Sequence, residues 1–251
     1  LQHNYDQQQI TQFTMKELCH AMRQLKKGKA ADNNGIIAEM LTNGGHRLRT
    51  TLLHLYNDIL KPDAPTPSTW QHTTIKVLHK SGDKQLPSNY RPIATIPLLY
   101  KLFSRLLYNR LEPTLDKNQS CDQAGFRRGR CTTDHLFTTV MLQEISDEWQ
   151  LPVFFATVDF KKAFDSVTHC AIWNALDEQG VEPAYTNSLK KLYCKQTATV
   201  KTDLLSRPFN IERGVKQGDP LSSLLFNSVS ESLMRHLKQK WQCKRWGIPL
   251  Q

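Results

Sequence analysis

The feature that most constrains the fold is a nearly continuous apolar run at residues 153–159, with the sequence VFFATVD. A run of this length without a polar face is typical of a β-strand that is buried on both sides. No segment approaches the roughly 18–20 apolar residues that a membrane span needs, so a transmembrane protein is excluded. We therefore expect a sheet that is covered by helices.

Asp159 ends this apolar run. A carboxylate at the end of an apolar strand is costly to bury unless a cation compensates its charge. Metal ligation at the carboxyl edge of the strand would supply such a cation. The alternative is an ordinary strand-end Asp that reaches water or caps the next turn.

Apolar residues at helical spacing predict helices along most of the chain. The first begins with a capping box, formed by Thr14 and Glu17, and we expect it to end at Gly28. Further helices are predicted at about 46–60, 97–111, 132–148, 169–179, 183–193 and 219–240.

Alternating residues predict strands, and polar or proline-rich segments predict the connections. Residues 1–12 are expected to form a frayed end, and 61–68, which holds three prolines, a loop. The order strand–helix–strand around 153–215 fits a split βαβ sheet, and the whole pattern predicts an α+β fold. Strands are expected at 74–79, 197–202 and 208–212, the last two as a pair.

The chain carries 33 Lys and Arg against 23 Asp and Glu, a formal net charge of +10. Because the excess is spread along the chain, it favours a folded basic groove for a polyanion, either nucleic acid or an acidic membrane surface. A basic soluble protein without such a partner is the alternative. The six cysteines form no C-x-x-C pair, so we expect reduced thiols in an intracellular protein and no zinc site.

Residues 214–222 (GVKQGDPLS) predict a strand, a turn bracketed by glycines and then a helix that Asp219 and Pro220 begin. The N-terminus of a helix attracts anions, and Gly218 allows the backbone to approach a ligand closely. An ordinary connection between a strand and a helix is the other interpretation.

Two cations flank a predicted turn at 80–83. Lys80 is its first residue, and Arg91 follows it in the sequence Tyr-Arg-Pro-Ile at 90–93. Together they could grip phosphates, with Arg91 able to do so through two hydrogen bonds. Solvated surface charge is the alternative.

Taken in order, these segments resemble the reverse transcriptase domain of non-LTR (LINE-type) retrotransposons. The resemblance covers about residues 29–240. The stretches that carry it are 29–41, VLHKSGD at 77–83, NYRPIATIPLLYKLFSRLLYNRL at 89–111, QAGFRRGR at 123–130, VDFKKAFDSV at 158–167 and GVKQGDPLSSLLFN at 214–227.

This resemblance implies a right-hand polymerase with helical fingers and a partial palm that holds a ferredoxin-like sheet. Its parts would be an N-terminal helical segment at 1–28, the fingers and finger–palm region at 29–150 and the partial palm at 151–251. The implied activity is DNA synthesis from dNTPs on an RNA template with a DNA primer, in the nucleus or the cytoplasm. The alternative is a non-catalytic nucleic-acid-binding remnant of such a polymerase.

The resemblance assigns Asp159 as the catalytic carboxylate that binds Mg²⁺, two ions in the complete enzyme, with the backbone carbonyl of Phe160 as a further ligand. Phe164 would lie against the incoming sugar and exclude a 2′-hydroxyl, although the same side chain could simply pack in the core. Asp165 is as readily a structural acid as a functional one.

For the nucleotide, the resemblance assigns Lys80 and Arg91 to the triphosphate. Gln217 and Gly218 would line the pocket of the nascent base pair. These roles require Asp159 to lie beside the bend at 217–218, in one shared cleft.

Several cations are candidates for contacts with the template and primer. Lys101 and Arg105 share a helix face because they are four residues apart. Arg127, Arg128 and Arg130 surround Gly129 and could follow a template backbone in a salt-sensitive way. A solvated cationic surface is the alternative for each of them.

Two departures from the family pattern stand out. Where the family has Lys-Ala-Pro-Gly-Pro-Asp-Gly, residues 29–35 read KAADNNG, so the loss of two prolines is expected to loosen this turn, in which only Gly35 clearly matches. The family also places a hairpin with paired Asp residues after the stretch WGIPLQ at 246–251, where this sequence stops. Since Asp159 alone cannot hold two divalent cations tightly, we expect this fragment, without hairpin and thumb, to be inactive by itself.

Overall fold

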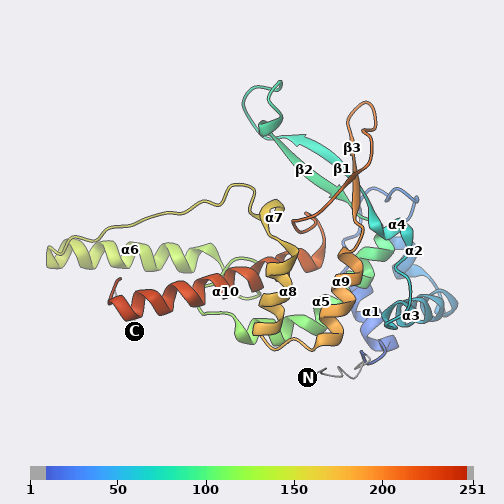
Figure 1. Cartoon of the computed structure of the whole chain (residues 1–251), viewed down its shortest axis with the longest axis horizontal. Coiled ribbons are helices and arrows are strands. Elements are labelled where there is room, and N and C mark those ends of the chain that lie inside the picture. Colours follow the sequence, from blue (N-terminus) through green and yellow to red (C-terminus); the bar gives the residue numbers. More distant parts are fainter. Residues whose placement is uncertain (1–9, 248–251) are drawn as a thin grey trace, which may run out of the picture.

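The computed structural model describes residues 10–247 and combines helices with one four-stranded sheet. Most helices form a body, the strands project from it on one side, and α6 extends away at one end (Figure 1). Within the described residues, no helix is long and apolar enough to cross a membrane. In chain order the elements are α1 (Met15–Arg23), α2 (Ala38–Asn43), α3 (His46–Leu60), α4 (Ser68–Gln71), β1 (His72–His79), the short 3₁₀ helix η1 (Pro87–Asn89), β2 (Tyr90–Thr95), α5 (Leu98–Asn118), α6 (Thr132–Trp149), α7 (Ala163–Ser166), α8 (His169–Glu178), α9 (Pro183–Tyr193), β3 (Thr197–Lys201), β4 (Phe209–Asn210) and α10 (Pro220–Lys244).

The helical body is centred on α5. This helix packs against α1 and α10, and α10 also packs against α8. An aromatic cluster joins α3, α4 and α5, with neighbouring ring centroids between 5.4 and 6.4 Å apart. Such rings contribute more than their buried area, so they fix the N-terminal half of α5 in place. The cluster consists of Tyr56, Trp70, Tyr100 and Phe103.

Helix α1 begins with the predicted capping box between Thr14 and Glu17, but it ends before the predicted stop at Gly28. The backbone N–H groups of Gln24 and Leu25 bond to carbonyls three residues back, at 3.1 and 3.2 Å. This tightens the last turn and ends the helix.

Helix α5 is longer than predicted and continues through Pro113 to Asn118. Leu111 and Leu115 are both buried, so the apolar face of the helix continues on either side of the proline. Since a proline removes only one backbone donor, the packing of this face outweighs its effect. The predictions for 46–60 and 183–193 are confirmed by α3 and α9.

The sheet has the strand order β2-β1-β3-β4 (Figure 1). Strands β1 and β2 form an antiparallel hairpin in which Thr74 faces Thr95. Strand β3 runs parallel to β1, with Ala198 opposite Thr73, and is antiparallel to β4. The predicted pairing of 197–202 with 208–212 is therefore confirmed, and the fold mixes helices with a mixed sheet.

The prediction of a buried strand at 153–159 is wrong. These residues run as an exposed, extended segment from α6 to α7, with Phe154 92% and Val158 77% exposed. A strand is stable only when a neighbour takes up its N–H and C=O groups, and no described strand pairs with this one. The sheet consequently does not contain the split βαβ unit expected around 153–215.

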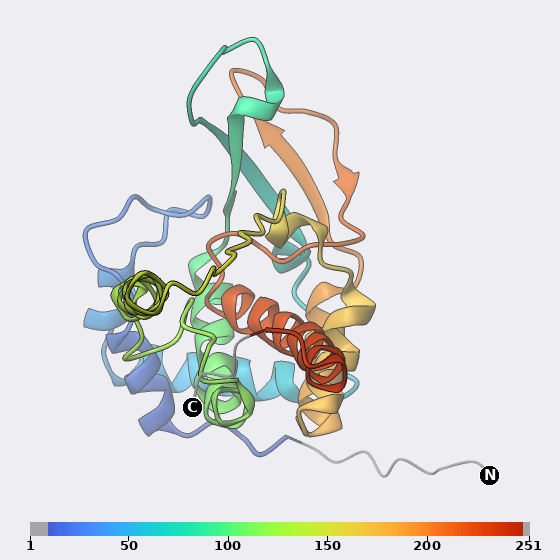
Figure 2. The same ribbon diagram turned by 90° about the vertical axis from the view of Figure 1, so that its left-hand side faces the viewer.

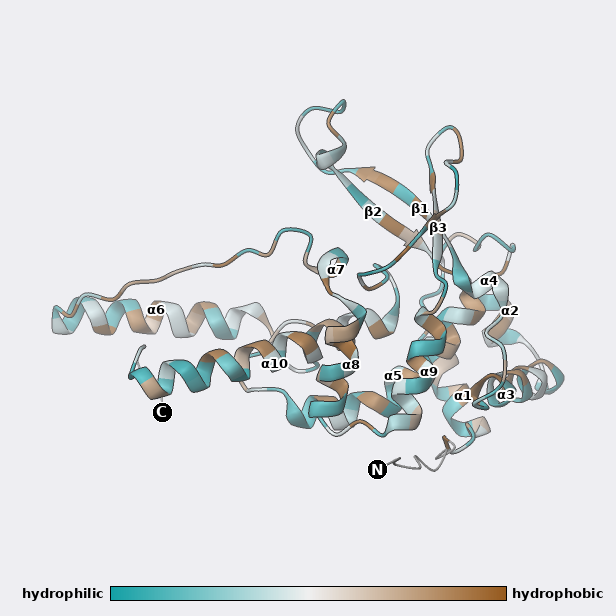
Figure 3. Ribbon diagram, viewed as in Figure 1, coloured by the Kyte–Doolittle hydropathy of each residue, from teal (hydrophilic) through white to brown (hydrophobic). Residues whose placement is uncertain are grey.

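Helix α6 is also exposed, and none of its side chains is buried. Figure 3 shows hydrophobic residues along both α6 and the extended segment that comes after it, and Figure 2 shows α6 standing apart from α10. The apolar faces of these two segments are thus left open to solvent, in contrast to the core of the body. Leu136, Phe137, Trp149 and Phe155 are among the exposed residues.

The prediction of a frayed end at 1–12 is partly outside the described residues, since only residues from Ile10 onward are included. Ile10 is buried, and Arg110 donates hydrogen bonds to the carbonyls of Thr11 and Gln12. Arg110 also pairs with Glu17 at 2.7 Å. Residues 10–12 are therefore held against the body, contrary to the prediction.

Candidate nucleic-acid interface

A cavity of about 570 Å³ opens between the start of α5, the loop before α2 and the turn before α10. It brings together four residues that the sequence had singled out, Lys101, Arg105, Phe164 and Gly218. We call it the basic groove because four cations line it: Lys26, Lys29, Lys101 and Arg105.

Lys101 and Arg105 lie one turn apart on the same face of α5, as predicted, and both are half-buried. Burial lowers the pKa of each below its ordinary value, while the charge of Asp219 acts in the opposite direction. Within residues 10–247 neither forms a salt bridge. The Arg105 guanidinium lies over the Tyr108 ring, 4.9 Å from its centre. A partly desolvated cation without a carboxylate partner attracts an anion more strongly than one in bulk water, so this pair suits phosphate.

Asp219 forms part of the lining of the groove and joins α10 to α5. Its carboxylate accepts hydrogen bonds from the Tyr100 hydroxyl at 2.9 Å, from the Ser104 hydroxyl and from the backbone N–H of Leu221 at 3.2 Å. The last of these is the predicted N-cap of α10. The buried carboxylate is thus fully engaged in holding the two helices together.

The loop at 29–35 forms the opposite rim, and its backbone is held by hydrogen bonds to Asp32. The Asp32 carboxylate accepts hydrogen bonds from the backbone N–H groups of Asn34 and Ile36, both at 2.9 Å, and from Leu98 at 2.7 Å. Gly35, with a φ of +76°, donates its N–H to the Asp32 carbonyl at 3.0 Å. Hydrogen bonds to Asp32 therefore hold this turn, and the expectation that the lost prolines loosen it stays a prediction.

Phe164 forms part of another wall of the groove. Its ring lies 5.0 Å from that of Phe226 and 5.6 Å from that of Phe126, and its carbonyl accepts a hydrogen bond from the N–H of Val215 at 2.8 Å. Phe164 therefore packs against other aromatic rings and also faces the groove, so the two interpretations of this residue are compatible.

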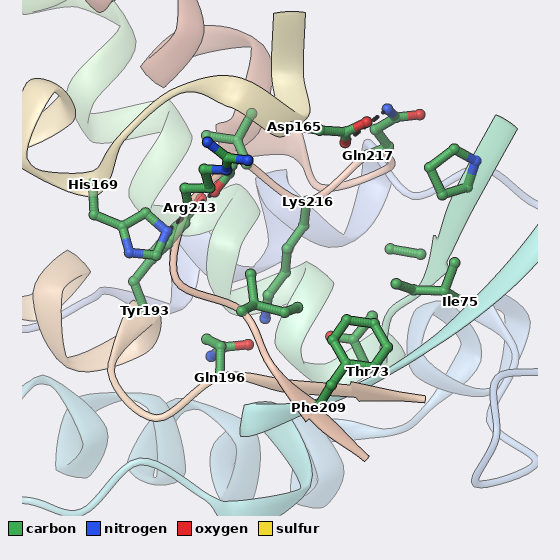
Figure 4. Close-up of a pocket in the computed structure, with 15 residues that line it drawn as sticks. Thr73, Ile75, Asp165, His169, Tyr193, Gln196, Phe209, Arg213, Lys216 and Gln217 are labelled. Carbon is green, nitrogen blue, oxygen red and sulfur yellow. Dashed lines mark hydrogen bonds between the residues drawn. The ribbon is translucent and has the colours of Figure 1, made fainter. Parts of the chain in front are cut away.

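The bend at 217–218 separates two cavities. Gly218, with a φ of +107°, lines the basic groove, whereas Gln217 lines a second cavity of about 220 Å³. There the Gln217 amide donates a hydrogen bond to Asp165 at 3.3 Å (Figure 4). Asp165 thus orients Gln217, which gives this carboxylate a structural role.

Lys80 and Arg91 lie on the β1–β2 hairpin, away from the groove. The backbone N–H of Lys80 bonds to the Asn89 carbonyl at 2.8 Å, and Arg91 pairs with Leu78 across the hairpin. Both side chains are exposed and line neither cavity. Their assignment to a triphosphate stays a prediction.

Asp159 and Phe160 are exposed on the extended segment and contribute to neither cavity. A tightly held divalent cation needs several oxygen ligands, and the described residues contain no group of three His, Cys, Asp or Glu side chains that could hold a metal. The residues present therefore do not fit a two-metal site. That Asp159 shares a cleft with Gln217 and Gly218 likewise stays a prediction.

The three arginines after α5 differ in their surroundings. Arg127 is only 10% exposed and pairs with Asp116 at 2.7 Å, while Arg128 is 66% exposed and lies 3.7 Å from Glu112. Arg130 is exposed. The Arg127 guanidinium is thus neutralised by Asp116 inside the fold. Of these three arginines, only Arg128 and Arg130 present their charges to solvent, where a template could contact them.

Lys26 and Lys29 are groove residues that the sequence reasoning missed. They come just after α1, in the run Lys-Lys-Gly-Lys at 26–29. A cluster of cations at the end of a predicted helix could have drawn attention to them, since basic clusters are the usual signature of a phosphate-binding surface.

Comparison with known proteins identifies the family of most of the chain. Residues 78–248 match the family described as reverse transcriptase (RNA-dependent DNA polymerase). The chain is 32% identical, over 84% of its length, to the "Retrovirus-related Pol polyprotein from type-1 retrotransposable element R2" of Popillia japonica. It is 27% identical, over 89% of its length, to the "Probable RNA-directed DNA polymerase from transposon BS" of Drosophila melanogaster. It spans 29% and 25% of the lengths of these two relatives.

Proposed function

The chain belongs to the reverse transcriptase (RNA-dependent DNA polymerase) family, and we propose that its basic groove holds the phosphate backbone of an RNA template paired with a DNA primer. It is a reverse transcriptase domain of the kind found in non-LTR retrotransposon polymerases. In the longer protein, the proposed reaction is the copying of RNA into DNA from dNTPs.

The observation that carries this proposal is the half-buried pair Lys101 and Arg105 on one face of α5, neither of which forms a salt bridge within the described residues. Lys26 and Lys29 extend the same positive surface across the groove. Contacts to phosphate give binding that is strong, dependent on salt and indifferent to sequence, as a polymerase requires.

The nucleotide end of the site is proposed at the wall that Phe164 and Gly218 form. The Phe164 ring can pack against the sugar of a nucleotide. Gly218 has no side chain, so a base pair can approach its backbone closely. Lys80 and Arg91 would reach the triphosphate from the β1–β2 hairpin.

Reverse transcriptases generally use divalent metal ions, and we propose Mg²⁺ as the ion here. Because the described residues do not complete a metal site, further carboxylates would have to join Asp159 in the longer protein. The carbonyl of Phe160 is the other ligand proposed from this chain.

The proposal is tested by measuring the affinity of the chain for a fluorescent RNA–DNA template–primer between 50 and 300 mM salt, about the range over which phosphate contacts are resolved. The double variant Lys101→Gln, Arg105→Gln should lower the slope of log affinity against log salt by about 2, since each phosphate contact contributes roughly 0.9. The matched control is Lys190→Gln, Arg207→Gln, which removes the same charge from exposed positions outside the groove. Equal losses in the two double variants would contradict the proposal.

The second candidate function is binding without catalysis, which the absence of a three-donor metal cluster among the described residues favours for this chain by itself. Primer extension with dNTPs and Mg²⁺ separates the two. We expect the 251-residue chain to bind the template–primer and to extend no primer. Sustained extension would overturn that expectation and favour the polymerase function for the chain as it stands.

A further inference from the structure

Helix α6 and the extended segment after it form an arm whose apolar side chains are left uncovered. At the end of α6, Gln150 adopts a φ of +50° and turns the chain back toward α7 (Figure 1). The backbone N–H of Leu151 fixes this turn by donating to the Ser146 carbonyl at 3.0 Å. We call residues 132–160 the apolar arm. None of them lines either cavity, so the arm is separate from the site of the proposed function.

On α6, the exposed apolar residues form a stripe. They recur every four residues, which places them on one face of the helix. A face of this kind normally packs against another element, but no described element covers this one. The stripe consists of Phe137, Met141, Ile145 and Trp149.

The extended segment adds free backbone groups to these apolar side chains. Residues 153–158 read VFFATV and include no charged residue, and within the described part of the chain no strand pairs with them. Most of these residues are β-branched or aromatic, the types that favour strands. A run that is apolar, uncharged and unpaired is a template on which another strand can form.

The exposed area of the arm is close to what one half of a dimer interface needs. Four of its aromatic side chains are between 58% and 92% exposed, namely Phe137, Trp149, Phe154 and Phe155. Because an aromatic side chain can bury about 150–250 Å², these four alone offer roughly 400–700 Å². A stable interface takes about 800 Å² from each partner, and exposed aliphatic residues such as Leu151 and Val158 can supply the rest.

The charges at the two ends of the segment favour a second copy of the chain as the partner. Asp147 and Glu148 precede the uncharged run. Lys161 and Lys162 follow it and outnumber the single acid there, Asp159. These side chains are exposed, and none forms a salt bridge within the described residues. Two antiparallel copies place the acidic end of each against the basic end of the other, whereas two parallel copies place like charges together.

We propose that the apolar arm is a homodimerisation surface, on which residues 153–158 pair antiparallel with the same residues of a second copy. The pairing satisfies backbone groups of both segments and buries apolar side chains of both arms. Because such an interface is two-fold symmetric, every substitution in it acts twice in each dimer.

The test is sedimentation velocity of the 251-residue chain without nucleic acid, at protein concentrations from about 1 to 100 μM, where micromolar dimerisation is resolved. We expect a reversible equilibrium between monomer and dimer. Phe154→Lys should weaken dimerisation by about tenfold or more, because it places two charges in an apolar interface. The matched control is Leu204→Lys, which makes the same change of charge at an exposed position between β3 and β4 and should leave dimerisation unchanged.

Exchanged charges test the antiparallel orientation. The acidic variant is Lys161→Glu, Lys162→Glu, and the basic variant is Asp147→Lys, Glu148→Lys. Each variant alone should dimerise more weakly than the wild type by about tenfold or more, because like charges then meet at both ends of the interface. Mixed one to one, the two variants should form a heterodimer at least as tight as the wild-type dimer, since opposite charges again meet at both ends.

A wild-type chain that stays monomeric over this range overturns the proposal, as do open-ended assemblies larger than a dimer. Equal dimerisation of Phe154→Lys and Leu204→Lys overturns it too, and so does a mixture of the two charge variants that stays monomeric. Melting temperatures show whether each variant is folded, and if Phe154→Lys is not, the charge variants alone decide. Dimerisation that survives in the Lys101→Gln, Arg105→Gln variant keeps this outcome separate from that of the basic groove.

Discussion

The carboxylate of Asp32 accepts a 2.7 Å hydrogen bond from the backbone N–H of Leu98, which lies 66 residues further along the chain. Leu98 is the first residue of α5, and the preceding residue, Pro97, provides no side-chain cap. Asp32 therefore caps this helix from a separate loop. The bond links the rim of the basic groove to the helix that carries Lys101 and Arg105.

Replacing this carboxylate should destabilise the chain. We expect Asp32→Ala to lower the free energy of unfolding by about 1–2 kcal/mol, the usual cost of removing a helix N-cap, measured by urea denaturation. Asp203→Ala, at an exposed position between β3 and β4, should change it by no more than about 0.5 kcal/mol. Equal effects of the two substitutions would show that the bond to Leu98 contributes nothing.

Lys216 should make stability depend on pH in the alkaline range. Burial lowers its pKa from 10.5 to about 8, against the attraction of Asp219. Below pH 8 Lys216 is protonated in both the folded and the unfolded chain, and burying its charge destabilises the folded chain. Between pH 8 and 10.5 Lys216 keeps its proton only in the unfolded chain, so its contribution to the free energy of unfolding rises with pH, by about 3 kcal/mol in total, and then levels off.

The measurement is urea denaturation at a series of pH values from about 7 to 10.5, compared between wild type and two variants. Lys216→Met removes the titrating group and should flatten the rise. Lys190→Met, at an exposed position on α9, should keep it. A rise of the same size in all three proteins would mean that other groups cause it.

The same substitution should destabilise the chain at Arg127 and have almost no effect at Arg128. The Arg127 guanidinium pairs with Asp116 and donates to the carbonyls of Ser120 at 2.7 Å and Gln123 at 3.1 Å. Arg127→Gln should therefore lower the free energy of unfolding by about 2–3 kcal/mol, because hydrogen bonds to charged groups are lost from a nearly buried site. Arg128→Gln should leave the free energy of unfolding within about 0.5 kcal/mol of the wild-type value. Urea denaturation of both variants measures the two losses, and a loss in Arg128→Gln as large as that in Arg127→Gln would contradict the prediction.

Gly214 and Gly180 form a second matched pair. Both have a positive φ, +92° and +73°, but a Cβ atom on Gly214 would lie 3.0 Å from the backbone oxygen of Asp165, whereas Gly180 faces open space. Gly180→Ala should cost about 1–2 kcal/mol from backbone strain alone, and Gly214→Ala about 3 kcal/mol or more. Both variants are compared by thermal unfolding. An equal loss of unfolding free energy in the two would show that the close contact between Gly214 and Asp165 has no effect on stability.

Elements defined by local signals could be predicted from the sequence. The apolar spacing in 46–60 and the proline at the start of 183–193 define α3 and α9 well, because both signals act within one or two turns. Motif order likewise identified Lys101, Arg105, Phe164 and Gly218, which meet in the basic groove.

Features that depend on distant partners could not be predicted. The composition of 153–159 favours a strand, but whether it is buried depends on a neighbouring strand, which the run itself does not reveal. The cap that Asp32 provides to Leu98 is invisible to any local pattern, and so is the pairing of Arg127 with Asp116. In both of these contacts a residue of α5 meets a loop outside that helix.

The parallel pairing of β1 with β3 has a consequence for how the chain is made. The facing residues His72 and Thr197 are 125 positions apart, so the central ladder of the sheet closes one of the longest loops in the molecule. A ribosome adds roughly 5–20 residues per second, so about 6–25 s separate the synthesis of β1 from that of its partner. For that interval one edge of the nascent hairpin offers free backbone donors and acceptors, which leaves it open to pairing with the strands of other chains.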